Sequence, residues 1–205
     1  MAVTLHAFIE EGLGNAWENL RTATRDLSPE QLGWRPPLPI GADPLAMARR
    51  GALSATVEYA ATGGAPPLTQ ANSVGYLLWH MGRVEDNFIQ RFILRGDEVW
   101  ASGGWQEKFG YETRGIGTGF SPEEAAGVPI PPTEVLWGYL DDVRARTLRY
   151  LAGLDWATLQ EKPRAERFPQ WSIQTILRQL SAHANQHLGE INYLRGLMGL
   201  GGALG

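Results

Sequence analysis

Residues 172–198 read SIQTILRQLSAHANQHLGEINYLRGLM, and this stretch decides the fold. Its apolar residues recur at intervals of three and four, which is the pattern of an amphipathic helix. Four of them lie within about 40° of one another around the predicted helix axis: Ile176, Leu180, Leu194 and Met198. A long helix with one apolar face needs other helices to cover that face, so the stretch predicts a helical bundle.

Two histidines lie in the middle of this apolar face. His183 and His187 are four residues apart, so both imidazoles project from one side of the helix, with Cβ atoms about 5–6 Å apart. Burying a polar ring without a partner costs about 1–3 kcal/mol, and one divalent metal ion would satisfy both rings at once. Hydrogen bonds to carbonyls or carboxylates are the alternative for such a pair taken alone.

Three further stretches carry the helical period, at about 3–25, 73–95 and 133–154, and almost nothing has the period of a strand. A short helix is expected after Ser28, where Ser-Pro-Glu-Gln has the form of a capping box. The sequence therefore predicts an all-α protein, a four-helix bundle with long crossover connections and short extra helices in the loops. We expect residues 1–205 to form a single domain with an insertion at about 38–71, which holds one more helix near 43–61.

The composition excludes several classes of protein. The 205 residues carry 18 Lys and Arg, 22 Asp and Glu, four His and no Cys, for a net charge of −4. Without cysteine, a disulfide framework, a zinc ribbon, a thiolate nucleophile and an iron–sulfur cluster are impossible. The acidic balance disfavours nucleic-acid binding. We expect no membrane span and no signal peptide, and hence a cytoplasmic protein.

A third histidine strengthens the metal hypothesis. His80 lies within the strongly apolar run Leu77–Met81 of the second long helix, at the edge of its main apolar stripe. One His from one helix and two from another make three ligands, the number typical of a catalytic metal site with an open position. His6, the fourth histidine, lies off the apolar centre of the first helix, and we expect it at the surface.

Three motifs together resemble the DinB/YfiT-like superfamily. The run NSVGYLLWHMGRVED (72–86) resembles its second helix. Gly96, Trp100 and GWQEKFG (104–110) are similar to the loop that follows, and HANQHLGEI (183–191) is similar to the H-x-x-x-H-x-G-x-I motif of its fourth helix. The motifs occur in the family's order and span most of the chain. Residues 38–71 depart from the pattern, because this link is longer than usual.

The resemblance implies both a site and a chemistry. It implies a three-His divalent metal site at His80, His183 and His187, and an enzyme that uses a low-molecular-weight thiol such as mycothiol or bacillithiol in an S-transferase reaction. Imidazole ligands suit several metals; zinc is our first choice from availability, with nickel or iron as alternatives. A metal-dependent hydrolase and a non-catalytic metal-binding stress-response protein are the alternative functions, and no catalytic residue is assigned.

Several carboxylates are weaker candidates. Glu190 follows His187 by three residues. It could orient a histidine ring, act as a base, or be an ordinary carboxylate at the edge of the helix face. Glu85 and Asp86 follow His80 by five and six residues. They fit either a role at the site or a solvated or salt-bridged helix face with Arg83.

The segment 97–132 is rich in Gly, Pro and aromatic residues. We expect it to pack over one end of the bundle, with Trp100 and Trp105 either lining a pocket or anchoring the loop. Its run Gly115–Gly119 resembles a nucleotide-binding loop only superficially, because it follows no predicted strand. The expected partner is a small-molecule substrate. A homodimer is possible if Trp137 and Tyr139 mark an exposed patch.

Overall fold

The computed structural model describes residues 5–36, 72–163 and 168–202 of the chain. These residues are all-α and contain no strand. The long helices are α1 (Leu5–Thr24), α5 (Val74–Asp86), α9 (Thr133–Ala152) and α10 (Ile173–Leu197). The short elements are α2 (Pro29–Gly33), the π-helix η1 (Asn87–Ile93), α6 (Val99–Ser102), α7 (Trp105–Phe109), α8 (Pro122–Ala126) and the 3₁₀-helix η2 (Thr158–Gln160).

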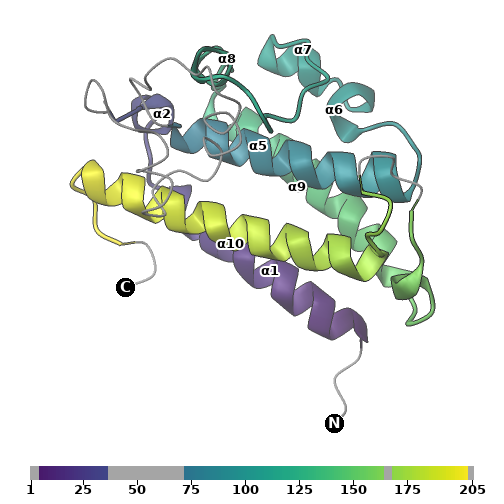
Figure 1. Ribbon diagram of the computed structural model, residues 1–205. Coiled ribbons are helices and arrows are strands. Elements are labelled where there is room, and N and C mark those ends of the chain that lie inside the picture. Colours follow the sequence, from purple (N-terminus) through teal and green to yellow (C-terminus); the bar gives the residue numbers. More distant parts are fainter. Residues whose placement is uncertain (1–4, 37–71, 164–167, 203–205) are drawn as a thin grey trace, which may run out of the picture.

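The four long helices form the predicted bundle. Helix α1 packs on α10 and α9, and α5 packs on α9 and α10, so the order around the bundle is α1–α10–α5–α9 (Figure 1). Consecutive helices α1 and α5 therefore occupy opposite corners, as do α9 and α10. A chain that visits opposite corners in succession needs long connections, which confirms the crossover topology that the sequence predicts.

Serine caps begin the two helices that carry the histidines. The Ser73 side chain accepts a hydrogen bond from the backbone N–H of Tyr76, and Ser172 accepts one from Thr175. Ser28 and Gln31 form the predicted capping box at the start of α2. Each cap satisfies backbone N–H groups that lack a partner inside the first turn of a helix, typically stabilising the helix by about 1 kcal/mol.

Helix α5 is buried along its entire length. Helices α9 and α10 cover two of its sides, and the segment with α6, α7 and α8 lies along another (Figure 1). The sequence predicts one helix up to Gly96, but the chain changes to a π-helix at Asn87, with Leu94 N–H bonded to the carbonyl of Ile89, five residues back. The wider turn changes the direction in which Asn87 and Phe88 project.

The aromatic segment packs along the flank of α5 and α9, instead of over one end of the bundle as expected (Figure 1). Trp100 is 1% exposed and contacts Tyr139 and Phe109 with ring centroids 5.1 and 4.9 Å apart. The indole N–H of Trp100 donates to the carbonyl of Thr113, and that of Trp105 donates to Asp142. Both tryptophans therefore anchor the segment to the bundle.

The predicted dimer patch is wrong. Trp137 is 6% exposed and packs edge-on against Trp17, with the guanidinium of Arg21 lying 4.2 Å from its ring. Tyr139 is fully buried. The two aromatic residues belong to the core because the segment 97–132 and helix α1 cover both sides of α9.

Two expectations fall outside the description. The insertion at 38–71, with its predicted helix, lies outside the described residues, and so does the side chain of His6 within α1. No helix among the described residues is long and apolar enough to cross a membrane.

Candidate metal centre

The structure brings together the three histidines that the sequence analysis groups. His80 comes from α5, and His183 and His187 come from adjacent turns of α10, which packs against α5. Nε2 of His183 lies 3.1 Å from Nε2 of His80 and 3.0 Å from Nε2 of His187, and the three candidate ligand atoms lie within 4.8 Å of one another. Nitrogens bound about 2.0–2.1 Å from one metal ion lie roughly 3.0–3.4 Å apart, so the spacing suits a shared ion.

The other ring nitrogens of His80 and His187 have partners. Nδ1 of His80 lies against the backbone carbonyl of Ile116, and Nδ1 of His187 lies 2.9 Å from a carboxylate oxygen of Glu190. Because both partners accept hydrogen bonds, each Nδ1 is placed to donate its proton, and Nε2 faces the other histidines. Of the three roles open to Glu190, orienting a ring is the one that this hydrogen bond supports.

His80 and His183 are neutral in the folded protein at neutral pH. Burial, aided by the nearby His187, lowers the pKa of His80 to about 4. Burial also lowers the pKa of His183 to about 2, with His187 and His80 contributing in the same direction. A neutral His183 carries one ring proton at most, so its Nε2 can donate to only one of the two Nε2 atoms that face it, those of His80 and His187. A cation among the three nitrogens would satisfy all of them, and the donor set therefore fits a metal ion.

A row of backbone carbonyls holds one side of α5. Tyr76, His80 and Arg83, which follow one another along one face of the helix, donate to the carbonyls of Gly117, Ile116 and Gly115 respectively. The loop thus runs antiparallel to α5 with one side-chain donor for each successive carbonyl. Sequence reasoning missed this role of the loop, although its closely spaced glycines were a signal that the backbone approaches something closely.

The close approach explains one of these glycines. Gly117 has a φ of +89°, and a Cβ atom there would lie 2.8 Å from Nδ1 of His80 and 2.9 Å from the hydroxyl oxygen of Tyr76. A side chain at this position would push the loop away from α5. The run Gly115–Gly119 is therefore a support for His80, and it does not follow a strand among the described residues, in agreement with the rejection of a nucleotide-binding loop.

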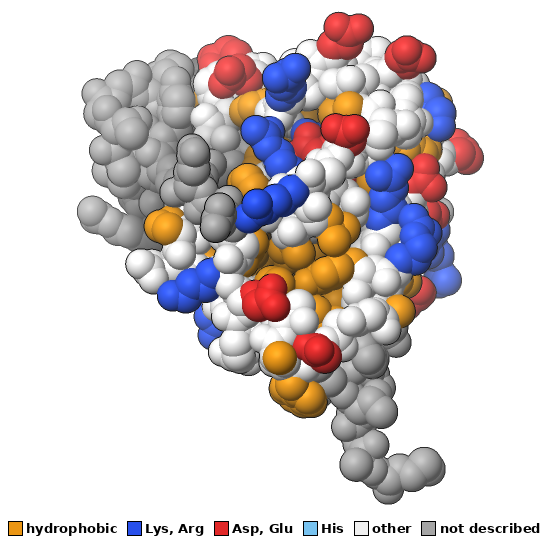
Figure 2. Space-filling model, turned by 90° about the vertical axis from the view of Figure 1, so that its right-hand side faces the viewer, with side chains coloured by type: hydrophobic (Ala, Val, Ile, Leu, Met, Phe, Trp, Pro, Cys, Tyr) orange, Lys and Arg blue, Asp and Glu red, His pale blue; other side chains and the backbone are white. Residues whose placement is uncertain are grey.

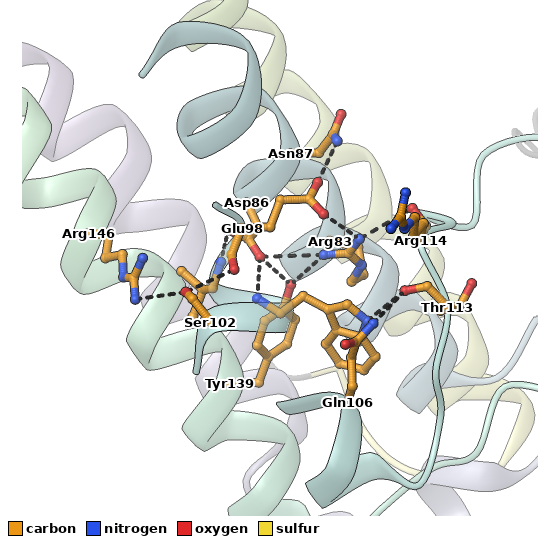
Figure 3. A network of polar contacts seen from close by, with 12 residues as sticks. Arg83, Asp86, Asn87, Glu98, Ser102, Gln106, Thr113, Arg114, Tyr139 and Arg146 are labelled. Carbon is orange, nitrogen blue, oxygen red and sulfur yellow. Dashed lines mark hydrogen bonds and ion pairs between the residues drawn. The ribbon is translucent and has the colours of Figure 1, made fainter. Parts of the chain in front are cut away.

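A buried polar network continues beyond Arg83 (Figure 3). Asp86 accepts hydrogen bonds from the backbone N–H groups of Val99 and Trp100, both at 2.8 Å, and from the Tyr139 hydroxyl at 3.1 Å. Arg83 lies 3.4 Å from Asp86 and 3.1 Å from Glu98. Burial raises the pKa of Asp86 to about 6, although these N–H groups act in the opposite direction. The network ties the segment after α5 to the bundle.

The solvated alternative for the face of Arg83 and Asp86 is therefore wrong, whereas the salt-bridged alternative is confirmed for this pair. Both are fully buried, because α6 and the residues after it cover this side of α5. Glu85 points elsewhere: its carboxylate pairs with Arg144 of α9 at 2.9 Å, and both side chains are buried. Glu85 contributes to helix packing and is not among the residues that surround the three imidazoles.

A cavity of about 290 Å³ lies beside the cluster, and we call it the His183 cavity. It is lined by residues of η1 and of the first half of α10, by the loop residues Ile116 and Thr118, and by Phe168 and Trp171. Of the three histidines, only His183 is among the lining residues. A small molecule in the cavity would therefore reach the cluster from the His183 side.

The fold agrees with that of known proteins. A conserved protein from Enterococcus faecalis, known from a crystal structure, is similar with a TM-score of 0.71 and 23% identity over 97% of this chain and 99% of that chain. That likeness shows a shared fold. No curated protein matches the chain. The family model described as the DinB superfamily matches residues 13–191. The chain belongs to the DinB superfamily.

Proposed function

We propose that the chain is a metal-dependent enzyme that holds one divalent ion on His80, His183 and His187 and catalyses an S-transferase reaction with a low-molecular-weight thiol. The observation that carries the proposal is the pairing of the Nδ1 atoms: Ile116 and Glu190 accept from the Nδ1 atoms of His80 and His187, so that the Nε2 atoms of both rings face Nε2 of His183. Membership of the DinB superfamily supports the same reading.

The ligand set indicates the chemistry. When bound, a divalent ion on three neutral imidazoles keeps its full charge and acts as a Lewis acid that lowers the pKa of a thiol or a water. Zinc is our first choice, with nickel or iron as alternatives. In the transfer, the thiol loses its proton, its sulfur forms a bond to an electrophilic carbon, and the leaving group departs with the electrons of the broken bond. The sulfur must come from a cosubstrate, because the chain has no cysteine.

The chain's own groups hold the site in shape. The Ile116 carbonyl and the Glu190 carboxylate keep the rings of His80 and His187 oriented, so the donors need no rearrangement to bind an ion. The proposed partner is a small-molecule substrate in the cytoplasm. The net charge of −4 supports the view that nucleic acid is not a partner.

Metal analysis tests the ligand assignment. We expect the purified protein to hold about one divalent ion per chain and His183→Ala to lose it. His6→Ala is the matched control, because it removes the histidine that lies apart in the sequence pattern, and it should keep full occupancy. Equal metal content in His183→Ala and the wild type would refute the assignment.

A spectroscopic titration tests the thiol. After exchange of the metal for cobalt or nickel, a bound thiol should produce a sulfur-to-metal charge-transfer band. The titration uses mycothiol, bacillithiol and glutathione, with their S-methyl forms as controls that lack the ionisable proton. If no thiol changes the spectrum of a fully loaded protein, a metal-dependent hydrolase or a non-catalytic metal-binding protein becomes the better description.

A further inference from the structure

The walls of the His183 cavity are rich in flat aromatic rings. Phe88 of η1 lies nearly parallel to Trp171, with centroids 6.0 Å apart and an interplanar angle of 12°, and Phe168 stacks on Trp171 at 4.3 Å and 21°. Phe92 packs edge-on against Phe88 at 5.3 Å. All four rings are half-buried although they are large and apolar. These rings stack on one another and also line the cavity, and an aromatic lining favours another flat ring as the occupant, through edge or face contacts.

The side of the molecule that carries η1 and the start of α10 exposes apolar side chains. Figure 2 shows the side of the molecule on which η1 and the start of α10 lie, and hydrophobic side chains gather at its centre with acidic and basic ones around them. Apolar surface that is open to solvent next to a cavity is typical of a ligand-binding site. The elements η1 and α10, which line the cavity, thus lie on a side of the protein that exposes apolar surface.

The polar side chains that the described residues contribute to the cavity carry no charge at neutral pH. They are the carboxamides of Asn87, Gln179 and Gln186 and the hydroxyl of Thr118, together with His183. No Asp, Glu, Lys or Arg occurs among the described residues that line it. A charged group would lose its hydration there without gaining an ionic partner, and this loss costs several kcal/mol in an apolar environment. The lining therefore disfavours ions and suits groups that accept or donate neutral hydrogen bonds.

From these observations we infer that the His183 cavity binds an uncharged, planar aromatic part of the substrate. The amide groups of Gln179 and Gln186 form hydrogen bonds to neutral polar atoms at its edge. His183 lines the cavity, so an occupant is held with one edge against the imidazole cluster. That the occupant is a substrate rests on the proposed function; the selection for an uncharged aromatic ring rests on the lining alone.

Two matched ligands test the inference. Naphthalene-2-carboxamide and naphthalene-2-carboxylate share one ring system and differ in charge. Their dissociation constants are measured by ligand-observed NMR on the full chain, as purified and after treatment with a chelator, since a metal ion would attract the carboxylate. In the chelator-treated protein we expect about millimolar binding of the carboxamide and at least about tenfold weaker binding of the carboxylate.

A lysine substituted into the cavity wall tests whether the two ligands bind in this cavity. Gln179→Lys places an ammonium group in the cavity wall, and Gln179 is exposed, so the substitution leaves the core unchanged. This variant should bind the carboxylate at least about tenfold more tightly than the wild type does. Gln174→Lys is the matched control: Gln174 is an exposed residue of the same helix outside the lining, and its lysine should leave both constants unchanged.

Three results would overturn the inference: no binding of either ligand, carboxylate binding as tight as that of the carboxamide, or equal effects of the two lysines. The metal analysis is independent of this experiment. A protein that holds one ion per chain and fails the ligand test keeps its proposed metal centre and loses only the assignment of the cavity. A protein that passes the ligand test without holding metal keeps the aromatic site and loses the proposed reaction.

Discussion

The ring nitrogen Nδ1 of His80 donates its proton to the backbone carbonyl of Ile116, a residue 36 positions further along the chain. This bond joins a buried helix to a loop, and it determines which nitrogen of His80 faces the other two histidines. A backbone carbonyl cannot donate a proton, so the opposite tautomer would lose this hydrogen bond. The orientation of one candidate ligand therefore depends on where the loop lies.

Gly117→Ala should weaken metal binding by displacing this loop. The new Cβ would lie 2.8 Å from Nδ1 of His80, and the left-handed backbone adds strain of about 1–2 kcal/mol. We expect the zinc dissociation constant, measured by competition with a chromophoric chelator, to rise about 10–100-fold. Gly119→Ala is the control, because its φ of +78° carries the same strain but its Cβ meets open space. Similar zinc affinities in the two variants would show that the contact with His80 is unimportant.

Glu190→Gln should also weaken metal binding, and it should leave the fold intact. The amide oxygen still accepts a hydrogen bond from Nδ1 of His187, but it lacks the negative charge that makes the imidazole a better donor to a metal. A loss of about tenfold in zinc affinity, with an unchanged melting temperature, is the expected result. Glu134→Gln, an exposed carboxylate of α9, is the control. An unchanged affinity would make Glu190 an ordinary surface carboxylate.

Acid should destabilise the metal-free protein through His183. Unfolded, this histidine takes up a proton as the pH falls below 6.5, whereas burial lowers its folded pKa to about 2, so the folded state loses stability as the pH falls. Each such proton contributes about 1.4 kcal/mol per pH unit to the slope. The buried Asp86, whose pKa is raised, has the opposite sign but is present in both proteins under comparison.

The comparison is between the wild type and His183→Gln in urea unfolding between pH 4.5 and 5.5. The free energy of unfolding of the variant should depend on pH less steeply, by about 1.4 kcal/mol per pH unit. Parallel pH profiles would mean that His183 takes up protons in the folded and unfolded states alike. The metal-loaded wild type should lose its ion across the same range, since protons compete with the metal for the imidazoles.

The ion pair of Glu85 and Arg144 should behave as a packing element. Both side chains are buried, and the guanidinium lies 4.2 Å from the ring of Trp17. Nε and Nη1 of Arg144 have no hydrogen-bond partner among the described residues. Glu85→Leu leaves a buried cation alone and should lower the free energy of unfolding by about 3–5 kcal/mol. Adding Arg144→Met should recover most of the loss, and zinc affinity should stay unchanged in both variants. A weaker zinc affinity in Glu85→Leu would give Glu85 a role at the site.

Local patterns in the sequence predicted much of this molecule. The spacing of apolar residues identified the four long helices, and the position of His183 and His187 on an apolar face predicted that they meet a partner helix. His80 was placed at the edge of its stripe, and the resemblance to a family joined it to the pair. In the structure, the packing of α5 against α10 brings His80 next to His183 and His187.

The features that sequence reasoning missed depend on contacts between distant parts of the chain. Asp86 and Arg83 follow a helical pattern that is compatible with solvent, and only the segment after α5 makes that face buried. Trp137 and Tyr139 are covered in the same way. The carbonyl of Ile116 has no signature in the sequence, since every residue has a carbonyl. The π-helix at Asn87 was also not predicted from the sequence, because its wider turn does not alter which residues are apolar.

The carbonyls of Gly115, Ile116 and Gly117, which accept hydrogen bonds from α5, also couple the position of this loop to metal binding at the histidines. If a docked loop raises the affinity of the three imidazoles for an ion, thermodynamic linkage requires that an ion hold the loop more tightly by the same factor. Metal binding at the three histidines would then restrict the position of Thr118, which lies in this loop and lines the neighbouring cavity. The loop would serve as the mechanical link through which the metal and the occupant of the cavity influence each other's binding.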